Sequence, residues 1–96
     1  MNEERYPSIN VLNVFRGFAT GKLRLKITPY RFQLPDGRSF VVKKVRQMTT
    51  QDVGGFRHYH YVLQTTDDRY FHIVFDSGKL AWKLIQEIDE ELLFNE

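Results

Sequence analysis

The three histidines of the chain have the spacing that most directly suggests chemistry. His58 and His60 are two residues apart, and side chains at that spacing on a β-strand point to the same face. Pairing with the following strand through a three-residue turn sets Asp76 opposite His58. The same pairing sets His72 diagonal to His60. Imidazole and carboxylate groups that share one face are what metal ligation needs.

The same histidines also suit a half-exposed polar face with no bound ligand. A two-residue turn at Ser77-Gly78 sets Lys83 opposite His72, and a cation beside a metal ion is repelled. We therefore predict no metal site and no cofactor. The residues that would form such a site are His58, His60, His72 and Asp76.

Other catalytic groups are sparse. Cysteine is absent, which excludes a thiol nucleophile, a Cys-ligated zinc and a disulfide scaffold. The serines are Ser8, Ser39 and Ser77, and none lies in a Gly-x-Ser-x-Gly motif. The adjacent carboxylates of Asp67-Asp68 and of residues 89–91 fall in a predicted turn and a predicted tail, where solvation explains them. We predict that the chain is not an enzyme.

Basic side chains gather in the first half of the chain. Residues 1–86 hold 14 basic and 7 acidic side chains, whereas residues 87–96 hold 5 acidic and no basic ones, for a net charge of +2. One predicted basic stripe follows a strand and the hairpin after it: Lys22, Arg24, Lys26, Arg31 and Lys43. Such a stripe suits phosphate binding, but cations also protect sheet edges from pairing. Only Tyr70 is predicted as an outward-facing aromatic for base stacking.

A partly apolar patch lies among the histidines on the predicted outer face. Its members are Val62, Val74, Ala81 and Ile85. Such a patch could dock a protein partner or a second copy of the chain. We therefore expect a non-enzymatic binding domain with a protein partner, and nucleic acid bound through the basic stripe as the alternative.

Three turns position these residues. The segment Leu34-Pro35-Asp36-Gly37 predicts a hairpin that sets Phe32 opposite Phe40 and Tyr30 opposite Val42. A three-residue loop at 66–68 keeps the apolar side chains of both flanking strands on one face, which a two-residue loop would not do. With the turn at Ser77-Gly78, one continuous inward face results: Tyr59, Tyr61, Leu63, Phe71, Ile73, Phe75, Leu80, Trp82 and Leu84.

The sequence also predicts two irregular points in the strands and the structure of the two chain ends. Apolar parity shifts at Thr28-Pro29 and again at Lys43-Lys44, so we expect a bulge at each. Gly54-Gly55 is predicted to be a loop between long strands. Helical apolar spacing over 9–18 favours a short helix over a strand. The last strand is expected to end near residue 86, followed by a frayed or helical tail over 87–94.

The prediction is a mainly β fold of five or six antiparallel strands in a meander. The sheet would be strongly curved, or closed into a small barrel or PH-like roll, with one short terminal helix. We expect an N-terminal segment at 1–21, a β domain at 22–86 and an acidic tail at 87–96. No apolar run approaches the ~20 residues of a membrane span, and the start resembles no secretory signal, so we expect a cytoplasmic protein without membrane contact.

The turn and core motifs resemble a small bacterial family of conserved hypothetical proteins. The resemblance covers residues 29–85, and the matching positions are Pro29-Tyr30-Arg31-Phe32, Asp36-Gly37-Arg38, Lys44-Val45, Gly54-Gly55, Arg57, Tyr59, Arg69-Tyr70-Phe71, Phe75 and Trp82. What it implies is a compact antiparallel β domain. It implies no catalytic residue and no ligand.

Overall fold

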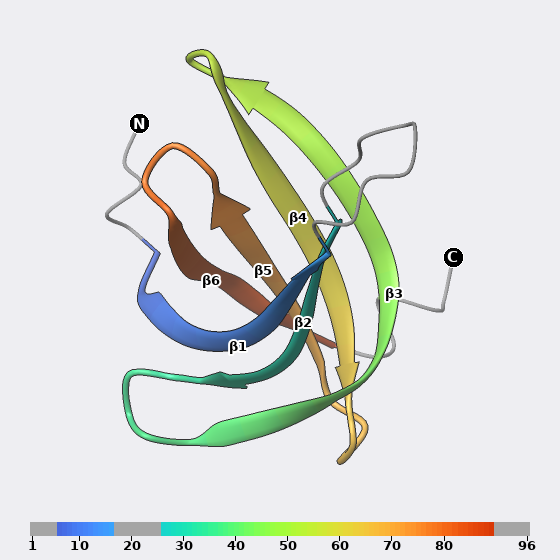
Figure 1. The fold of residues 1–96 in the computed structure, drawn as a ribbon. Helices are drawn as coiled ribbons and strands as arrows, with labels where there is room; N and C mark the ends of the chain where they lie inside the picture. Colours follow the sequence, from blue (N-terminus) through green and yellow to red (C-terminus); the bar gives the residue numbers. More distant parts are fainter. Residues whose placement is uncertain (1–5, 17–25, 90–96) are drawn as a thin grey trace.

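The computed structural model describes residues 6–16 and 26–89, which form a closed barrel of six antiparallel strands (Figure 1). Each strand pairs with the next one along the chain, and β1 closes the ring by pairing with β6. The described ranges contain no helix. The strands are β1 (Ser8–Arg16), β2 (Lys26–Gln33), β3 (Ser39–Val53), β4 (Phe56–Thr65), β5 (Tyr70–Asp76) and β6 (Ala81–Ile88).

The seam between β1 and β6 is short. Its register pairs Ser8 with Lys83 and Ile9 with Trp82. The backbone N–H of Leu84 also donates to the carbonyl oxygen of Pro7 at 3.0 Å. The described strands of the barrel therefore begin at Ser8 and end at Ile88, outside the predicted 22–86 domain at both ends. The long β3–β4 hairpin rises beyond the other strands (Figure 1).

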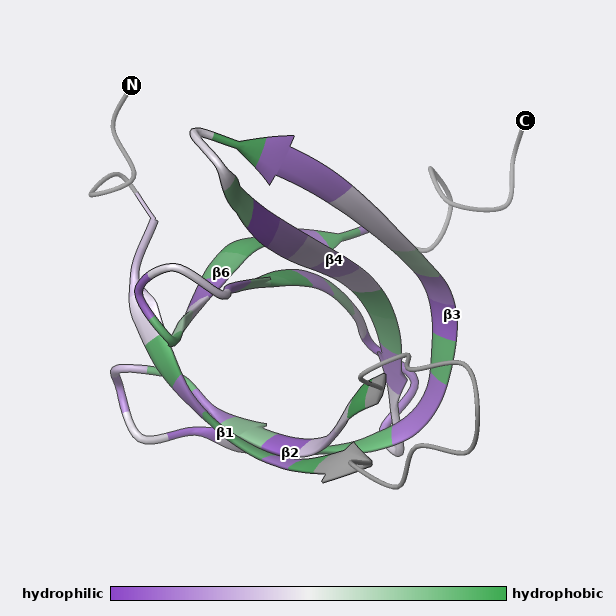
Figure 2. Ribbon diagram, turned by 45° about the horizontal axis from the view of Figure 1, so that its top comes forward, coloured by the Kyte–Doolittle hydropathy of each residue, from purple (hydrophilic) through white to green (hydrophobic). Residues whose placement is uncertain are grey.

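Apolar side chains fill the inside of the ring that Figure 2 shows. Phe71 on β5 contacts Phe32 on β2 and Phe40 on β3, with ring centroids 5.1 and 4.7 Å apart. Trp82 on β6 lies 5.7 Å from the ring of Tyr61 on β4. Aromatic contacts therefore join strands that lie on different sides of the ring. The buried core is Ile9, Ile27, Phe32, Leu34, Phe40, Tyr61, Leu63, Phe71, Ile73, Phe75 and Trp82.

Most of the predicted hairpin geometry is confirmed. The loop at 66–68 gives the expected pairs Tyr59–Phe75, Tyr61–Ile73 and Leu63–Phe71. The turn at 34–37 pairs Phe32 with Phe40. Gly54-Gly55 joins β3 to β4 with φ angles of 59° and 88°, which glycine adopts without a steric cost.

The turn between β5 and β6 is longer than predicted. Four residues, 77–80, connect the two strands, where the sequence predicted two. The Asp76 carboxylate stabilises the longer turn, because its Oδ1 accepts hydrogen bonds from the backbone N–H groups of Gly78 and Lys79 at 2.9 and 3.2 Å. This capping is local side-chain chemistry of the kind that selects turn length.

The longer turn removes Leu80 from the core. Phe75 pairs with Trp82, and Leu80 is 76% exposed with a φ of 54°. The prediction that Leu80 faces inward is wrong. Because the register moved by two residues, side-chain parity was preserved and Trp82 still faces inward.

The predicted N-terminal helix is wrong for residues 9–16. This segment is β1, with Ile9 buried, Asn10 exposed, Val11 half-buried and Leu12 exposed. Seven residues of β1 pair with β2, and this pairing places one side of β1 against the barrel core. Tertiary pairing therefore overrides the helical spacing of the apolar residues. Residues 17 and 18 lie outside the described part.

The parity shift predicted at Thr28-Pro29 occurs at Tyr30. Pro29 is fully buried, and the register with β1 skips Tyr30, which makes it the extra residue of a bulge. Tyr30 is therefore exposed, and its predicted place on the buried face is wrong. The bulge predicted at Lys43-Lys44 is confirmed, and a second one follows at Arg46.

The β6 strand continues to Ile88, two residues past its predicted end. The Glu87 carboxylate accepts two hydrogen bonds from the Arg69 guanidinium, both 2.8 Å long. These bonds lower the pKa of Glu87. Arg69 also packs over the Phe40 ring at 4.9 Å. Glu87, predicted to open an acidic tail, is thus part of the barrel, whereas residues 90–96 lie outside the described part.

We predict that Tyr61→Phe lowers the free energy of unfolding at neutral pH. The difference between variant and wild type should become smaller at alkaline pH. The buried Tyr61 hydroxyl donates to the Ile27 carbonyl oxygen at 2.6 Å, so the variant should lose about 1–2 kcal/mol of unfolding free energy. Burial, and then Tyr59, raise the pKa of Tyr61 to about 12. The contribution of the Tyr61 hydroxyl to the free energy of unfolding is complete below about pH 10, the pKa of tyrosine in the unfolded chain. It is lost as the pH rises through the higher pKa of the folded state.

Urea unfolding of both proteins at about pH 8 and about pH 11 measures this effect. The stability gap between wild type and variant should narrow at the higher pH. A gap of equal size at both values would contradict the role of the Tyr61 hydroxyl.

We also predict that Gly78→Ala destabilises the barrel through Phe56. A Cβ atom at Gly78 would lie 2.6 Å from Cγ of the Phe56 ring, so the ring must move, at a cost of about 1 kcal/mol. In a Phe56→Ala background the same substitution should cost almost nothing. Denaturant midpoints of the four proteins form the double-mutant cycle; a cost that persists without the ring would rule out this contact as its cause.

Candidate functional site

Two imidazoles meet on the outer side of the sheet, where β4 and β5 run side by side. His60 Nδ1 lies 2.8 Å from His72 Nε2, and the ring centroids are 5.1 Å apart. The register pairs His60 with Val74 and Val62 with His72, so the two histidines are diagonal neighbours, as predicted.

The hydrogen bonds of His60 define its tautomer when it is neutral. Its Nε2 lies 3.2 Å from Gln51 Oε1 on β3. An amide oxygen only accepts hydrogen bonds, so His60 Nε2 carries the proton and Nδ1 carries the lone pair. In this arrangement His72 Nε2–H donates to His60 Nδ1.

Burial disfavours the charged form of both imidazoles. Burial lowers the pKa of His60, and the nearby His58 lowers it further. Burial also lowers the pKa of His72, with an added contribution from His60. The pair therefore presents neutral nitrogen ligands or hydrogen-bonding groups rather than positive charge.

An open groove of about 300 Å³ lies over this pair. Apart from the two imidazoles, its lining side chains carry no titratable group. They are Gln47, Thr49, Gln51, His60, Val62 and His72. The groove suits a small polar ligand or ion better than an apolar molecule, because amide and hydroxyl groups surround the rings.

His58 and Asp76 form a separate pair at the end of the same face. They are opposite each other in the register, as predicted, with His58 Nε2 3.4 Å from Asp76 Oδ2. The other carboxylate oxygen of Asp76 binds the turn at 77–80. Within residues 6–16 and 26–89, no three His, Cys, Asp or Glu side chains form a cluster that could hold a metal ion.

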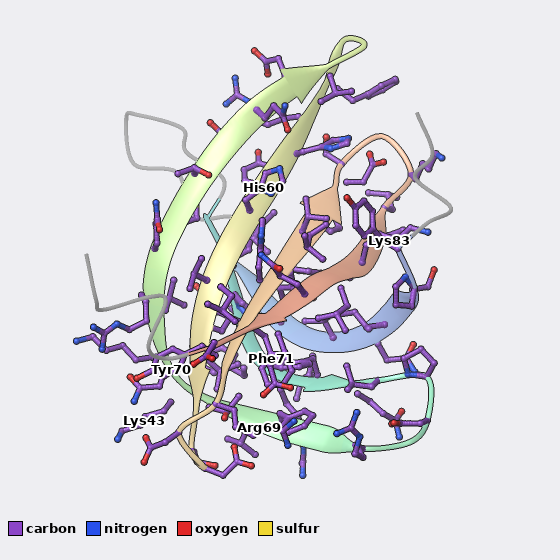
Figure 3. All side chains as sticks on the ribbon, turned by 180° about the vertical axis from the view of Figure 1, so that it is seen from behind. Lys43, His60, Arg69, Tyr70, Phe71 and Lys83 are labelled. Atoms are coloured by element: carbon purple, nitrogen blue, oxygen red, sulfur yellow. The ribbon has the colours of Figure 1, made fainter. Side chains whose placement is uncertain are left out.

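Lys83 does not face His72, so that part of the predicted register is wrong. The four-residue turn moves the pairing, and Lys83 is opposite Val74. A bulge next to His72 then sets Gln86 opposite that histidine. Figure 3 shows His60 and Lys83 well separated across the sheet, and Lys83 Nζ donates to Ser8 Oγ at 3.3 Å. The repulsion expected from Lys83 thus does not apply.

The predicted apolar patch offers little accessible surface. Val74 is only 6% exposed, and Val62, Ala81 and Ile85 are half-buried. Tyr70, the aromatic expected to point outward into solvent, is buried as well. These side chains do lie on the outer side of β4, β5 and β6, but they do not form an exposed docking face.

A larger apolar surface lies on the outer side of β1, β2 and β3. One row across these strands is Leu12, Arg31 and Val41, which are register partners. Tyr30, displaced by its bulge, lies beside this row. The exposed fractions are 65% for Leu12, 44% for Val14, 48% for Tyr30 and 42% for Val41. We call Leu12, Val14, Tyr30, Arg31 and Val41 the β1–β3 face.

A shallow depression of about 350 Å³ runs along one side of this face. Its walls include the polar side chains of Asn10, Gln33 and Ser39. Asn10 Nδ2 donates to Gln33 Oε1 at 3.3 Å. Exposed apolar side chains around an arginine, with polar side chains at the border, are typical of protein-binding surfaces.

Sequence reasoning missed the β1–β3 face for two reasons. The segment with Leu12 and Val14 was predicted to be helical, and Tyr30 was assigned to the core. The alternation of the apolar Ile9 and Val11 with the polar Ser8 and Asn10 was the available signal for a strand.

The basic stripe is only partly described. Lys22 and Arg24 lie outside the described residues, and Lys26 is the first residue of β2. Arg31 is exposed in the middle of the β1–β3 face. Lys43 is exposed at the β3 bulge, with its Nζ 3.7 Å from Asp68 Oδ1. Figure 3 shows Lys43 at the same end of the barrel as Arg69.

No described segment is a helix of the length and apolarity needed to cross a membrane. Comparison with protein-family models, curated proteins and solved structures finds no significant match. The resemblance to a small bacterial β-domain family thus stays a prediction, and the function has to be inferred from the geometry.

Proposed function

We propose that this barrel is a non-enzymatic protein-binding domain that uses its β1–β3 face. The observation that carries the proposal is the group of four exposed apolar side chains around Arg31 on three adjacent strands. Contiguous exposed apolar surface of this kind marks interaction sites in soluble proteins. Tyrosine and arginine are also the residue types that most often dominate binding energy.

The charge of the face defines the partner. β1 and β2 contain no acidic residue, and the only acid in β3 is Asp52, which pairs with Arg57 at 3.3 Å. Arg31 in the centre and Lys43 at the border therefore favour an anionic partner. The partner we propose is an acidic protein segment whose apolar side chains contact Leu12 and Val41.

Single-stranded nucleic acid is the second candidate for the same face. The exposed ring of Tyr30 beside Arg31 supports it, because stacking next to a cation is how such proteins hold bases. Leu12, Val14 and Val41 favour the protein partner instead, since aliphatic side chains give no aromatic stacking surface.

Peptide display tests the proposal. Selection on the wild-type barrel, with counter-selection on Leu12→Ser/Val41→Ser, should recover peptides rich in Asp or Glu together with Leu, Ile or Phe. Arg31→Glu should weaken the best peptide at least tenfold, equivalent to about 1.4 kcal/mol. Leu80→Ser is the matched control, because Leu80 is equally apolar and exposed but lies in the β5–β6 turn.

Two results would contradict the proposal. One is that the selected peptides show no acidic bias, or that Leu80→Ser weakens their binding as much as Leu12→Ser does. The other is salt-sensitive binding of a labelled single-stranded oligonucleotide that Tyr30→Ala abolishes while peptide binding is absent. Fluorescence anisotropy at low and moderate salt measures the second result.

A further inference from the structure

We propose that His60 and His72 form a binding site for a divalent transition-metal ion, with Cu²⁺ preferred, on the outer side of β4 and β5. The ligand atoms are Nδ1 of His60 and Nε2 of His72. This site is separate from the β1–β3 face, so it does not depend on the proposed protein-binding function.

The distance between His60 Nδ1 and His72 Nε2 suits a metal ion whose ligands lie at right angles to each other. Two nitrogens bound at 2.0–2.1 Å to one ion lie about 2.8–3.0 Å apart at 90° and about 3.3–3.4 Å apart at the tetrahedral angle. The hydrogen bond of the metal-free pair already holds the two nitrogens 2.8 Å apart, which is the spacing of the first geometry. Tetragonal Cu²⁺ and Ni²⁺ have the first geometry, and Zn²⁺ has the second. Binding strength in this series also rises to a maximum at Cu²⁺.

Gln51 prepares His60 to act as a ligand. Histidines that bind metals usually donate their second ring N–H to a carbonyl or carboxylate oxygen, which sets the tautomer and the ring orientation. Gln51 Oε1 has this position, 3.2 Å from His60 Nε2. The lone pair of His60 is therefore already on the nitrogen that faces His72.

Metal binding requires one proton rearrangement. The proton that His72 Nε2 donates to His60 moves to His72 Nδ1, so that both facing nitrogens carry lone pairs and each ring stays neutral. Gln47 and Thr49 line the same groove, so their side-chain oxygens are the nearest candidates for further ligands beside water.

The charges around the pair permit a cation. Lys83, the cation expected to face His72, is opposite Val74 instead and donates to Ser8. Gln86 takes the position opposite His72. The other imidazole of β4, His58, lies 3.4 Å from Asp76, whose carboxylate also binds the turn at 77–80.

Titration of the full chain with Cu²⁺ tests the proposal. Calorimetry in a glycine buffer, which competes for adventitious copper, should give one ion per chain. The electron paramagnetic resonance spectrum should be tetragonal with coupling to two imidazole nitrogens. His60→Gln and His72→Gln should each weaken binding at least tenfold, and Zn²⁺ should bind at least tenfold more weakly than Cu²⁺.

His58→Gln is the matched control, because His58 lies on the same face of the same strand yet is outside the proposed site. It should leave affinity and stoichiometry unchanged. If the His60 or His72 variants fail to fold, paramagnetic broadening in the wild-type protein locates the ion, and the amides of His60 and His72 should broaden first. Broadening centred elsewhere, equal loss in His58→Gln, or tighter binding of Zn²⁺ would overturn the proposal.

Discussion

The packing of Phe71 against Phe32 and Phe40 is the contact on which the rest of the barrel depends. It joins β5 to β2 and β3 across the interior, with ring centroids 5.1 and 4.7 Å apart. Because side chains alternate along a strand, a residue that faces inward determines that its neighbours face outward. Phe71 inside places His72 outside, and Tyr61 inside places His60 outside. Phe32 inside likewise places Arg31 at the centre of the β1–β3 face.

Departures from regular pairing then shape both candidate surfaces. The bulge at Tyr30 lets two consecutive residues, Tyr30 and Arg31, face solvent together. The longer turn at 77–80 sets Lys83 opposite Val74, and the bulge beside His72 sets Gln86 opposite that histidine. Such bulges often re-aim side chains next to functional sites. In each case one or two extra residues change which chemical groups lie next to one another.

The two surfaces lie on different strands and differ in chemistry. The β1–β3 face is apolar and cationic, and it belongs to the strands that come first in the chain. The imidazole pair lies on β4 and β5, in a groove lined by amide and hydroxyl groups. A partner on one surface therefore need not displace a ligand on the other.

The sequence by itself determined the strands from residue 56 to residue 76, because turn length and apolar parity there agree on one register. Thr66, Asp67 and Asp68 set a loop that only one pairing satisfies, and the positions of His58, His60, His72 and Asp76 follow from it. The bulge at Lys43-Lys44 was predictable for the same reason. The candidate metal ligands were thus identifiable as neighbours, although their 2.8 Å contact was not.

Only the tertiary structure decided the features that depend on partners distant in the sequence. Residues 9–16 form a strand because β2 and β6 supply its hydrogen bonds, and no local signal encodes that pairing. The turn before β6 has four residues because the Asp76 carboxylate binds Gly78 and Lys79, a choice that parity cannot make since two and four residues give the same face. The exposed β1–β3 face follows from that closure and from the bulge at Tyr30, and so it became visible only in the folded barrel.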